Sequence, residues 1–281
     1  MNKISAIVPV APWDLNRSQL LFKSLKKFFD PGSLETLYIT FPDRQKMKDI
    51  LALLKLDFPV EVMTEEDLIP ASDYSIFKKR KGWLRQQIVK MYISSRVKTE
   101  FYICLDADVL CFRQATYADL IKDDRPGMNL EPKTWHKYWW DASLKVLKMP
   151  DPGTSYGMSS STNIFITAEV LSLMEYLEKI YGKSFIRTLL NWFWTNTYKF
   201  GREWTEYKLY WLYIELHQKS GLYDPRNKIL GNSIWKSTKV VDEALFREIF
   251  DPLQEGYFTV CQSTRVKDDV IAHFSRQELG I

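Results

Sequence analysis

Residues 101–110 read FYICLDADVL, and this stretch decides the fold class of the 281-residue chain. Five apolar residues in a row end at Asp106, which predicts a short buried strand whose carboxyl end carries Asp106 and Asp108. Two carboxylates one residue apart repel each other and are costly to desolvate. A divalent cation removes both costs, and Mg²⁺ commonly takes one or two carboxylates together with substrate phosphates. The stretch therefore predicts a metal–diphosphate site at a strand end.

The residues before it alternate between expected strands and expected helices. Strands are expected over Ile4–Val10, Thr36–Thr40, Pro59–Met63 and Phe101–Leu105, and helices over Ser18–Phe29, Arg44–Leu54 and Gly82–Ser95. Such alternation indicates a parallel sheet with right-handed crossovers. Ligands of these open sheets bind beyond the carboxyl ends of the strands. The loop after Val10 and the loop at Asp106 are therefore the candidate binding sites.

Composition and cysteine spacing exclude several classes of protein. The net charge of +4 is too mild for a nucleic-acid-binding protein, although it suits a partner that carries phosphates. The N-terminus does not resemble a signal peptide and no stretch approaches about 18 uncharged apolar residues, which predicts a soluble, cytoplasmic protein. Cys104, Cys111 and Cys261 match no zinc spacing, so we expect buried free thiols in a reducing compartment.

The stretch Lys122–Ser161 is rich in proline and tryptophan. Trp135, Trp139 and Trp140 lie close together in it, and we expect an insertion or a long active-site loop rather than a linker. His136 lies among these tryptophans and could contact an acceptor substrate.

Two segments together resemble a known group of enzymes. Residues 82–90 read GWLRQQIVK and are followed, after a short spacer, by FYICLDAD at 101–108. This pair resembles the nucleotide-sugar-binding half of GT-A glycosyltransferases, most closely bacterial glycosyltransferase-like proteins that share the Trp-x-Arg-Gln-Gln helix. The order of strands and helices resembles the glycogenin and lipopolysaccharide galactosyltransferase group more loosely. The likeness extends over roughly residues 1–115, with scattered patches beyond.

The resemblance implies an α/β fold of the GT-A (Rossmann-like) type, with a mixed, mostly parallel sheet flanked by helices. It implies a single glycosyltransferase domain over residues 1–281. Residues 1–115 would be the nucleotide-sugar-binding half, and residues 116–281 the C-terminal acceptor-side half.

The resemblance also implies a metal site for Mn²⁺ or Mg²⁺. Enzymes of this type close the site formed by the two aspartates, here Asp106 and Asp108, with a histidine near the C-terminus. Residues 271–275 read IAHFS, which we interpret as an apolar strand end that carries one imidazole, so His273 is the expected third ligand. His217 lies in a helical run and is expected to be structural.

The helix before the metal loop offers further contacts to a nucleotide-sugar. The guanidinium of Arg85 has the fixed fork that suits phosphate or sugar hydroxyls. Gln86 could contact the sugar through its amide, whereas Gln87 is expected to face water. The basic run at residues 78–81, KKRK, is expected to be solvated, although it could attract the diphosphate or an anionic membrane surface.

Two loops are implied to line the rest of the pocket. GT-A enzymes seat the nucleotide base on the loop after the first strand, here the segment of Pro9, Trp13 and Asp14. Trp13 could stack on uracil, and Asp14 could accept a proton from the base or the ribose. Asn163 precedes the strand-like stretch Ile164–Ile166 and resembles the segment that lines the pocket for a sugar.

The expected catalytic base is Glu206. Residues 203–210 read EWTEYKLY, a helix start in which Thr205 is a candidate N-cap. A carboxylate there resembles the acid that deprotonates the acceptor hydroxyl in inverting GT-A enzymes, which must lie within hydrogen-bonding reach of that hydroxyl. Glu203 is the close competitor, and Glu206 could also merely balance the helix dipole.

These observations favour a metal-dependent, inverting glycosyltransferase of polysaccharide biosynthesis. A UDP-sugar is the favoured substrate, and the acceptor would be a saccharide or a lipid-linked saccharide, with peripheral membrane contact and no nucleic-acid partner. A nucleotidyltransferase using the same carboxylates is one alternative, although the chain has no glycine-rich phosphate loop. A non-catalytic carbohydrate-binding protein is the other.

Overall fold

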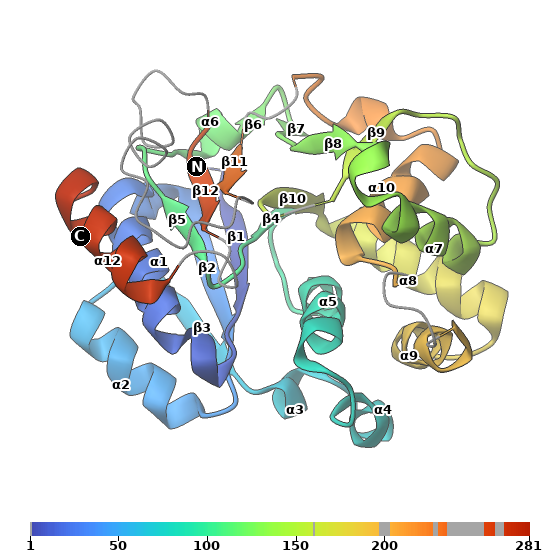
Figure 1. The fold of residues 1–281 in the computed structure, drawn as a ribbon, viewed down its shortest axis with the longest axis horizontal. Coiled ribbons are helices and arrows are strands. Elements are labelled where there is room, and N and C mark those ends of the chain that lie inside the picture. The colour runs from blue at the N-terminus through green and yellow to red at the C-terminus, as the bar shows by residue number, and fades with distance from the viewer. Residues whose placement is uncertain (1, 160, 197–202, 227–229, 235–255, 262–266) are drawn as a thin grey trace.

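A five-stranded sheet forms the centre of the computed structural model of the chain, in the order β10-β4-β1-β2-β3 (Figure 1). Its strands are β1 (Ile4–Pro9), β2 (Leu34–Thr40), β3 (Val60–Met63), β4 (Phe101–Cys104) and β10 (Asn163–Ile166). The first four run parallel and β10 runs antiparallel to β4, so the predicted mixed, mostly parallel sheet is confirmed. The structure describes residues 2–159, 161–196, 203–226, 230–234, 256–261 and 267–281.

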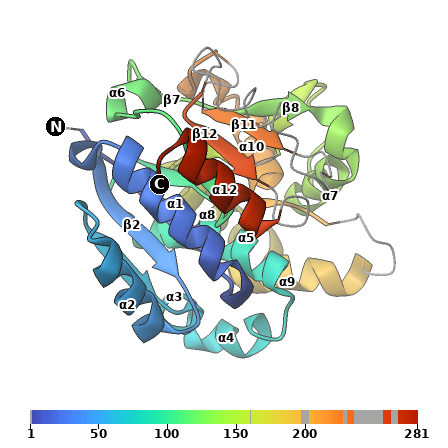
Figure 2. The ribbon, with the colours of Figure 1, turned by 60° about the vertical axis from the view of Figure 1, so that its left-hand side comes forward.

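Helices cover both faces of this sheet. They are α1 (Leu15–Phe28), α2 (Arg44–Leu54), α5 (Gly82–Tyr92) and the C-terminal α12 (Asp268–Glu278); the short helices α3 (Glu65–Leu68) and α4 (Ala71–Phe77) lie between β3 and α5 in the chain. One side carries α1, α2 and α12, and the other carries α5 (Figure 1). Figure 2 shows α12 lying along α1, where Arg17 of α1 forms an ion pair with Asp268 at 2.6 Å. The predicted bounds of α2 agree with the structure. The side chain of Asp43 caps the N-terminus of this helix and fixes where it begins.

The segment after Asp106 and Asp108 is joined to the C-terminal part of the chain by a second, small sheet. This sheet has the order β11-β12-β5, with β5 (Val109–Cys111), β11 (Gly231–Ile234) and β12 (Phe258–Cys261). The backbone N–H of Cys261 donates to the carbonyl of Asp108 at 2.8 Å. Strand β12 therefore fixes the loop that carries both aspartates.

The remaining elements that follow β5 build the second half of the fold. They comprise α6 (Tyr117–Leu120), β6 (Ile121–Lys122), β7 (Arg125–Pro126), β8 (Leu130–Pro132), α7 (Lys137–Leu147), β9 (Tyr156–Met158), α8 (Thr167–Tyr181), α9 (Phe185–Asn196) and α10 (Glu206–Leu216), with 3-10 turns at Lys133–His136 and Ser220–Leu222; the 3-10 turns at Pro12–Asp14, Pro31–Ser33 and Ile93–Ser95 precede them in the chain. Helix α10 is buried from Glu206 to Ile214 and lies in the middle of this half. Its Tyr210 ring packs against Phe165 of β10 at 4.4 Å between centroids. The core of the sheet thus continues into α10 and holds the start of that helix in place.

Two expected segments differ from the structure. The stretch Lys122–Ser161 is not a long loop, because it contains α7, whose Trp140 and Leu147 are fully buried; residue 160 lies outside the described residues. The stretch Ile271–Ser275 is helical, not a strand end. Its buried residues Ile271, Phe274 and Ser275 follow the spacing of one helix face, so the apolar run had the period of a helix.

The structure also bears on the expected state of the cysteines and on membrane-spanning helices. The three cysteines are free and buried, as predicted. Among the described helices, none is long and apolar enough to cross a bilayer.

Gly157 of β9 allows α7 and α10 to approach each other closely. A Cβ atom at this position would lie 2.7 Å from Cζ3 of Trp140 and 3.0 Å from Cδ1 of Trp211, and both indoles are buried. We therefore expect Gly157→Ala to lower the free energy of unfolding by about 1–3 kcal/mol, measured by urea denaturation. Gly221→Ala is the matched control, since its Cβ would meet nothing within 4 Å. Equal stability of the two variants would show that the contact relaxes freely.

Candidate active site

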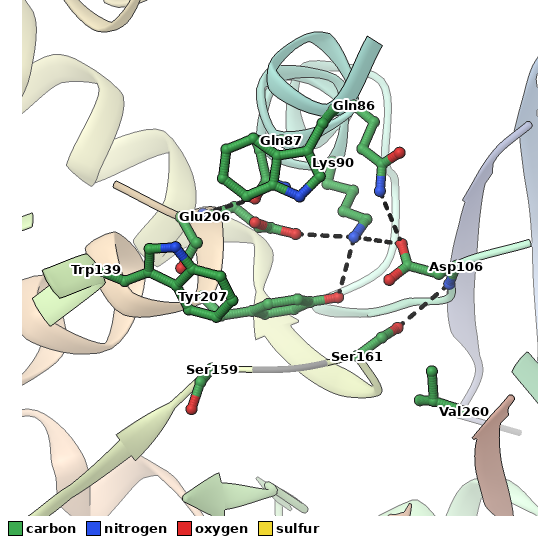
Figure 3. A pocket seen from close by; sticks show the side chains of 12 residues that line it. Gln86, Gln87, Lys90, Asp106, Trp139, Ser159, Ser161, Glu206, Tyr207 and Val260 are labelled. Carbon is green, nitrogen blue, oxygen red and sulfur yellow. Dashed lines mark hydrogen bonds and ion pairs between the residues drawn. The ribbon is translucent and has the colours of Figure 1, made fainter. Parts of the chain in front are cut away.

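The candidate active site is a pocket between α5, the carboxyl end of β4 and the start of α10. Its lining residues are Trp83, Gln86, Gln87, Lys90, Asp106, Trp139, Ser159, Ser161, Thr205, Glu206, Tyr207 and Val260. Figure 3 shows Gln86, Gln87 and Lys90 projecting from one side of α5 toward Asp106 and Glu206. These three residues recur at the spacing of one helix face. The pocket thus lies where the sheet topology predicts a ligand, beyond the end of β4.

Lys90 joins the two carboxylates of the pocket. Its ammonium lies 2.5 Å from Oδ1 of Asp106 and 2.8 Å from Oε1 of Glu206, and the side chain is 1% exposed. It also donates to the hydroxyl of Tyr207 at 3.4 Å. Burial disfavours the charged ammonium, but the two carboxylates outweigh burial and raise the pKa of Lys90 well above its ordinary value. Lys90 is therefore a fixed positive charge inside the pocket.

Asp106 is held by its own loop as well as by Lys90. Its backbone N–H donates to Oγ of Ser161 at 3.2 Å, and that hydroxyl donates to the carbonyl of Cys104 at 3.3 Å. The amide of Gln86 donates to Oδ1 of Asp106 at 3.3 Å. The Asp106 carboxylate is therefore directed into the pocket by groups from α5 and the segment before β10.

Asp108 lies on the side of the loop that faces β12. One of its carboxylate oxygens is buried, and its charge adds to burial in raising the pKa of the Cys261 thiol. The two aspartates therefore come from one loop, but Asp106 is the one that lines the described pocket.

The expected third metal ligand is not beside them. His273 lies on the exposed face of α12, with its ring edge against Phe274. Within the described ranges, no three His, Cys, Asp or Glu side chains are grouped so that they could hold a metal ion. The predicted set of Asp106, Asp108 and His273 is therefore not assembled in this part of the chain, because the C-terminal segment is a helix that buries its other face.

Glu206 has the environment of a proton acceptor. The side chain is 1% exposed, and its Oε2 atom has no hydrogen-bond partner among the described residues. Its backbone N–H donates to Oε1 of Gln87 at 3.2 Å, and Thr205 caps the helix as predicted. Burial raises the pKa of Glu206, Lys90 opposes this shift, and Asp106 adds to it. The competitor Glu203 is partly exposed and does not line this pocket.

The three polar residues of α5 that were considered as contacts to a nucleotide-sugar do not all lie where the sequence predicts. Arg85 forms an ion pair with Glu65 of α3 at 3.0 Å and does not line the pocket. Gln86 does line it, as expected. Gln87 is buried and binds the backbone of Glu206, so the expectation that it faces water was wrong. The helix turns Gln87 rather than Arg85 inward because Leu84, Ile88 and Met91 fix its apolar face.

The residues expected around the nucleotide base occupy the loop between β1 and α1. The Trp13 ring is 73% exposed and lies beside Gly82 at the start of α5, and Pro9 is partly exposed at the end of β1. Burial raises the pKa of Asp14; Arg17 opposes the shift, and Asp268 and Asp106 add to it. Asp14 is therefore close enough to Asp106 for the two carboxyl groups to interact electrostatically.

Asn163 has a role inside the protein. It is fully buried; its Oδ1 accepts from the backbone N–H of Asn129 at 2.8 Å, and its Nδ2 donates to the carbonyl of Asn129 at 3.3 Å. Both ends of the amide join β10 to the segment before β8. The structure therefore supports a positioning role for Asn163 rather than direct contact with a ligand.

Sequence reasoning did not single out Lys90 or Tyr207 as site residues. The available signal was the stripe of polar residues Gln86, Gln87 and Lys90 on a helix whose other residues are largely apolar. Such a stripe on a buried helix must be satisfied by other groups. It therefore indicated a polar pocket, although not its partner Glu206, 116 residues further along the chain.

The sequence matches DUF6492, a family of unknown function, over residues 1–272. The chain belongs to the DUF6492 family. No curated protein matches this DUF6492 sequence. Its fold is similar to that of mouse xyloside xylosyltransferase 1 in its apo form, with a TM-score of 0.56, 10% identity, and coverage of 94% of this chain and 99% of that one.

Two further solved structures are similar to this DUF6492 chain. The galactosyltransferase LgtC, in complex with donor and acceptor sugar analogs, has a TM-score of 0.55 at 10% identity and covers 99% of this chain and 97% of its own. The glycosyltransferase GlyE of Streptococcus pneumoniae has a TM-score of 0.52 at 12% identity, and the match spans 98% of this chain but 60% of GlyE. At these identities the likeness concerns the fold, and the predicted GT-A fold is confirmed.

Proposed function

We propose that this DUF6492 chain transfers a glycosyl group from a nucleotide-sugar, preferably a UDP-sugar, to a hydroxyl of a saccharide or lipid-linked saccharide, with inversion. The observation that carries the proposal is one pocket lined by both Asp106 of the D-x-D segment and Glu206, whose Oε2 atom is a buried acceptor without a hydrogen-bond partner among the described residues. The GT-A fold supports it, because the fold places this pocket beyond the end of β4.

The proposed chemistry uses groups that the pocket already contains. Oε2 of Glu206 takes the proton of the acceptor hydroxyl. The hydroxyl oxygen attacks the anomeric carbon as the bond between this carbon and the departing nucleoside diphosphate breaks. A raised pKa makes a carboxylate a better base near neutral pH. Lys90 keeps the other oxygen of Glu206 fixed and carries positive charge on the side where the anionic diphosphate would leave. Proton transfer and bond breaking are thereby served by neighbouring side chains.

Asp106 and Asp108 would share an Mn²⁺ or Mg²⁺ ion with the diphosphate. Two carboxylates suit these oxygen-preferring cations, which complete their shells with phosphates and water. When bound, such an ion would supply Lewis-acid neutralisation of the leaving group. The position of His273 on the outside of α12 does not fit a third ligand, so the proposal rests on the two aspartates.

The nucleotide base would lie over the loop that carries Pro9, Trp13 and Asp14. This is supported by the exposure of the Trp13 ring and its place beside the start of α5. It is also supported by the electrostatic influence of Asp106 on Asp14.

A panel of UDP-, GDP- and CMP-sugars, with and without Mn²⁺, tests the proposal. We expect at least one nucleotide-sugar to bind in calorimetry and to be hydrolysed slowly in an Mn²⁺-dependent manner. Asp108→Ala should weaken Mn²⁺-dependent binding about tenfold or more, which corresponds to about 1.4 kcal/mol. Arg85→Ala tests separately whether Arg85 contacts the phosphates directly, as the sequence predicts. Failure of every nucleotide-sugar to bind would overturn the proposed function, and unchanged affinity in Asp108→Ala would overturn the metal assignment.

A further inference from the structure

Four aromatic side chains form a stacked group beside the pocket, which we call the aromatic ledge: Trp83, His136, Tyr138 and Trp139. The imidazole of His136 stacks on the indole of Trp139 with centroids 4.1 Å apart and planes inclined by 21°. Trp83 stacks on the same Trp139 indole, with centroids 6.4 Å apart and planes inclined by 28°, and Tyr138 meets Trp139 edge-on at 5.4 Å. Three short segments thus present their rings together, from α5, α7 and the turn before α7.

The ledge is accessible and shares a wall with the candidate base. Trp83 is 38% exposed and Tyr138 is 43% exposed. Trp83 and Trp139 line the same pocket as Glu206. In Figure 3, Trp139 lies on the opposite side of Glu206 from Asp106. The pocket therefore has one end that carries the D-x-D carboxylate and another that is aromatic.

The chemistry of this second end suits a neutral sugar ring. A pyranose has an apolar face of C–H groups and a polar edge of hydroxyls, and indole rings offer a flat apolar surface of matching size. Burial lowers the pKa of His136, so its imidazole is neutral near pH 7 and the ledge is not a phosphate site. Exposed aromatic groups that line a concave site with a few polar groups mark ligand binding rather than ordinary surface.

We propose that the aromatic ledge is the acceptor subsite, where a neutral pyranose stacks on Trp139 and Trp83 and directs a hydroxyl toward Oε2 of Glu206. This inference rests on the proposed function and adds to it the class of acceptor and the residues that select it. A lipid surface fits the ledge less well, because two of its rings line a pocket rather than protrude from the molecule.

Binding of unmodified disaccharides tests the ledge without any transfer reaction. Cellobiose, lactose and maltose would be titrated by calorimetry and by saturation-transfer NMR. We expect at least one to bind, and Trp139→Ala to weaken it by about tenfold or more, whereas Trp139→Phe keeps most of the affinity because it keeps a ring. Trp135→Ala is the matched control: Trp135 is 57% exposed, comes from the same segment and does not line the pocket.

The outcomes separate this inference from the proposed function. Absence of disaccharide binding, or equal binding by Trp139→Ala and the unaltered protein, would overturn the ledge. Nucleotide-sugar binding is measured on the same variants. If the protein binds a nucleotide-sugar but its saccharide binding does not depend on Trp139, the proposed function is retained and the proposed acceptor subsite is wrong. Trp139-dependent saccharide binding without any nucleotide-sugar binding would support the aromatic ledge as a saccharide site and overturn the proposed function. Trp139-dependent sedimentation with phosphatidylglycerol vesicles, without saccharide binding, would replace the saccharide by a membrane.

Discussion

Glu206→Gln is expected to lower the rate of glycosyl transfer by about 10²–10⁴-fold, the usual contribution of a positioned general base. The amide preserves the shape of the side chain and can still accept a hydrogen bond from Lys90, but it cannot take the proton of the acceptor hydroxyl. Affinity for the nucleotide-sugar should be nearly unchanged, because Lys90 lies between Glu206 and Asp106. Single-turnover kinetics and calorimetry on the same preparation separate the two effects.

The pH dependence adds a second signature of the base. Protonation of Glu206 removes the base, so the rate should fall as the pH drops through its pKa. Burial raises that pKa above the ordinary carboxyl range, so this fall should begin at higher pH than for an exposed glutamate. Glu203→Gln is the matched control, since Glu203 precedes the same helix and does not line the pocket. A Glu206→Gln variant that retains transfer with an unchanged pH profile would remove Glu206 as the base.

The sheet could be predicted because each of its parallel strands is a local apolar run. The four strands before residue 105 and helix Arg44–Leu54 were found within a residue or two, and the strand containing Ile164–Ile166 was recognised as well. The position of the site followed from topology alone, since the carboxyl end of a buried strand carries the aspartates. The helix-start position of Glu206 and its Thr205 cap were local signals of the same kind.

What escaped prediction depends on contacts between distant parts of the chain. Nothing near Lys90 in the sequence specifies that its ammonium meets Glu206, and nothing near Arg85 specifies that Glu65 takes its charge. The helical period at Ile271–Ser275 was hidden because five residues are too few to distinguish a strand from a helix face. That ambiguity accounts for the misplaced His273, since only a strand end would have directed its imidazole inward.

Lys90→Met is expected to cause the largest loss of stability, about 3–5 kcal/mol in the free energy of unfolding at neutral pH. Methionine fills a similar volume but leaves Glu206, which is 1% exposed, as a buried carboxylate without its counter-charge. Arg85→Met is the control on the same helix: its ion pair with Glu65 is partly exposed and should be worth at most about 1 kcal/mol. Urea denaturation of both variants measures the contrast.

Acid should reduce the loss in Lys90→Met. Without Lys90, the main group that opposes the burial-induced rise in the pKa of Glu206 in the folded state is lost. A carboxyl whose folded-state pKa is raised stabilises the fold below the unfolded pKa, and that contribution is lost as the pH rises through the folded pKa. The deficit of Lys90→Met should therefore be small in acid and grow toward neutral pH.

The double variant Lys90→Met with Glu206→Gln separates lost charge pairing from lost packing. If the loss of stability in Lys90→Met comes from the unpaired carboxylate, the neutral amide should restore much of the free energy of unfolding at neutral pH. The remaining loss of stability should then no longer depend on pH. The two substitutions would then couple by about 1 kcal/mol or more, as expected for residues in direct contact. Additive losses with no change in pH dependence would mean that Lys90 acts by filling space. The positive charge between Asp106 and Glu206 would then not be what holds the two sides of the pocket together.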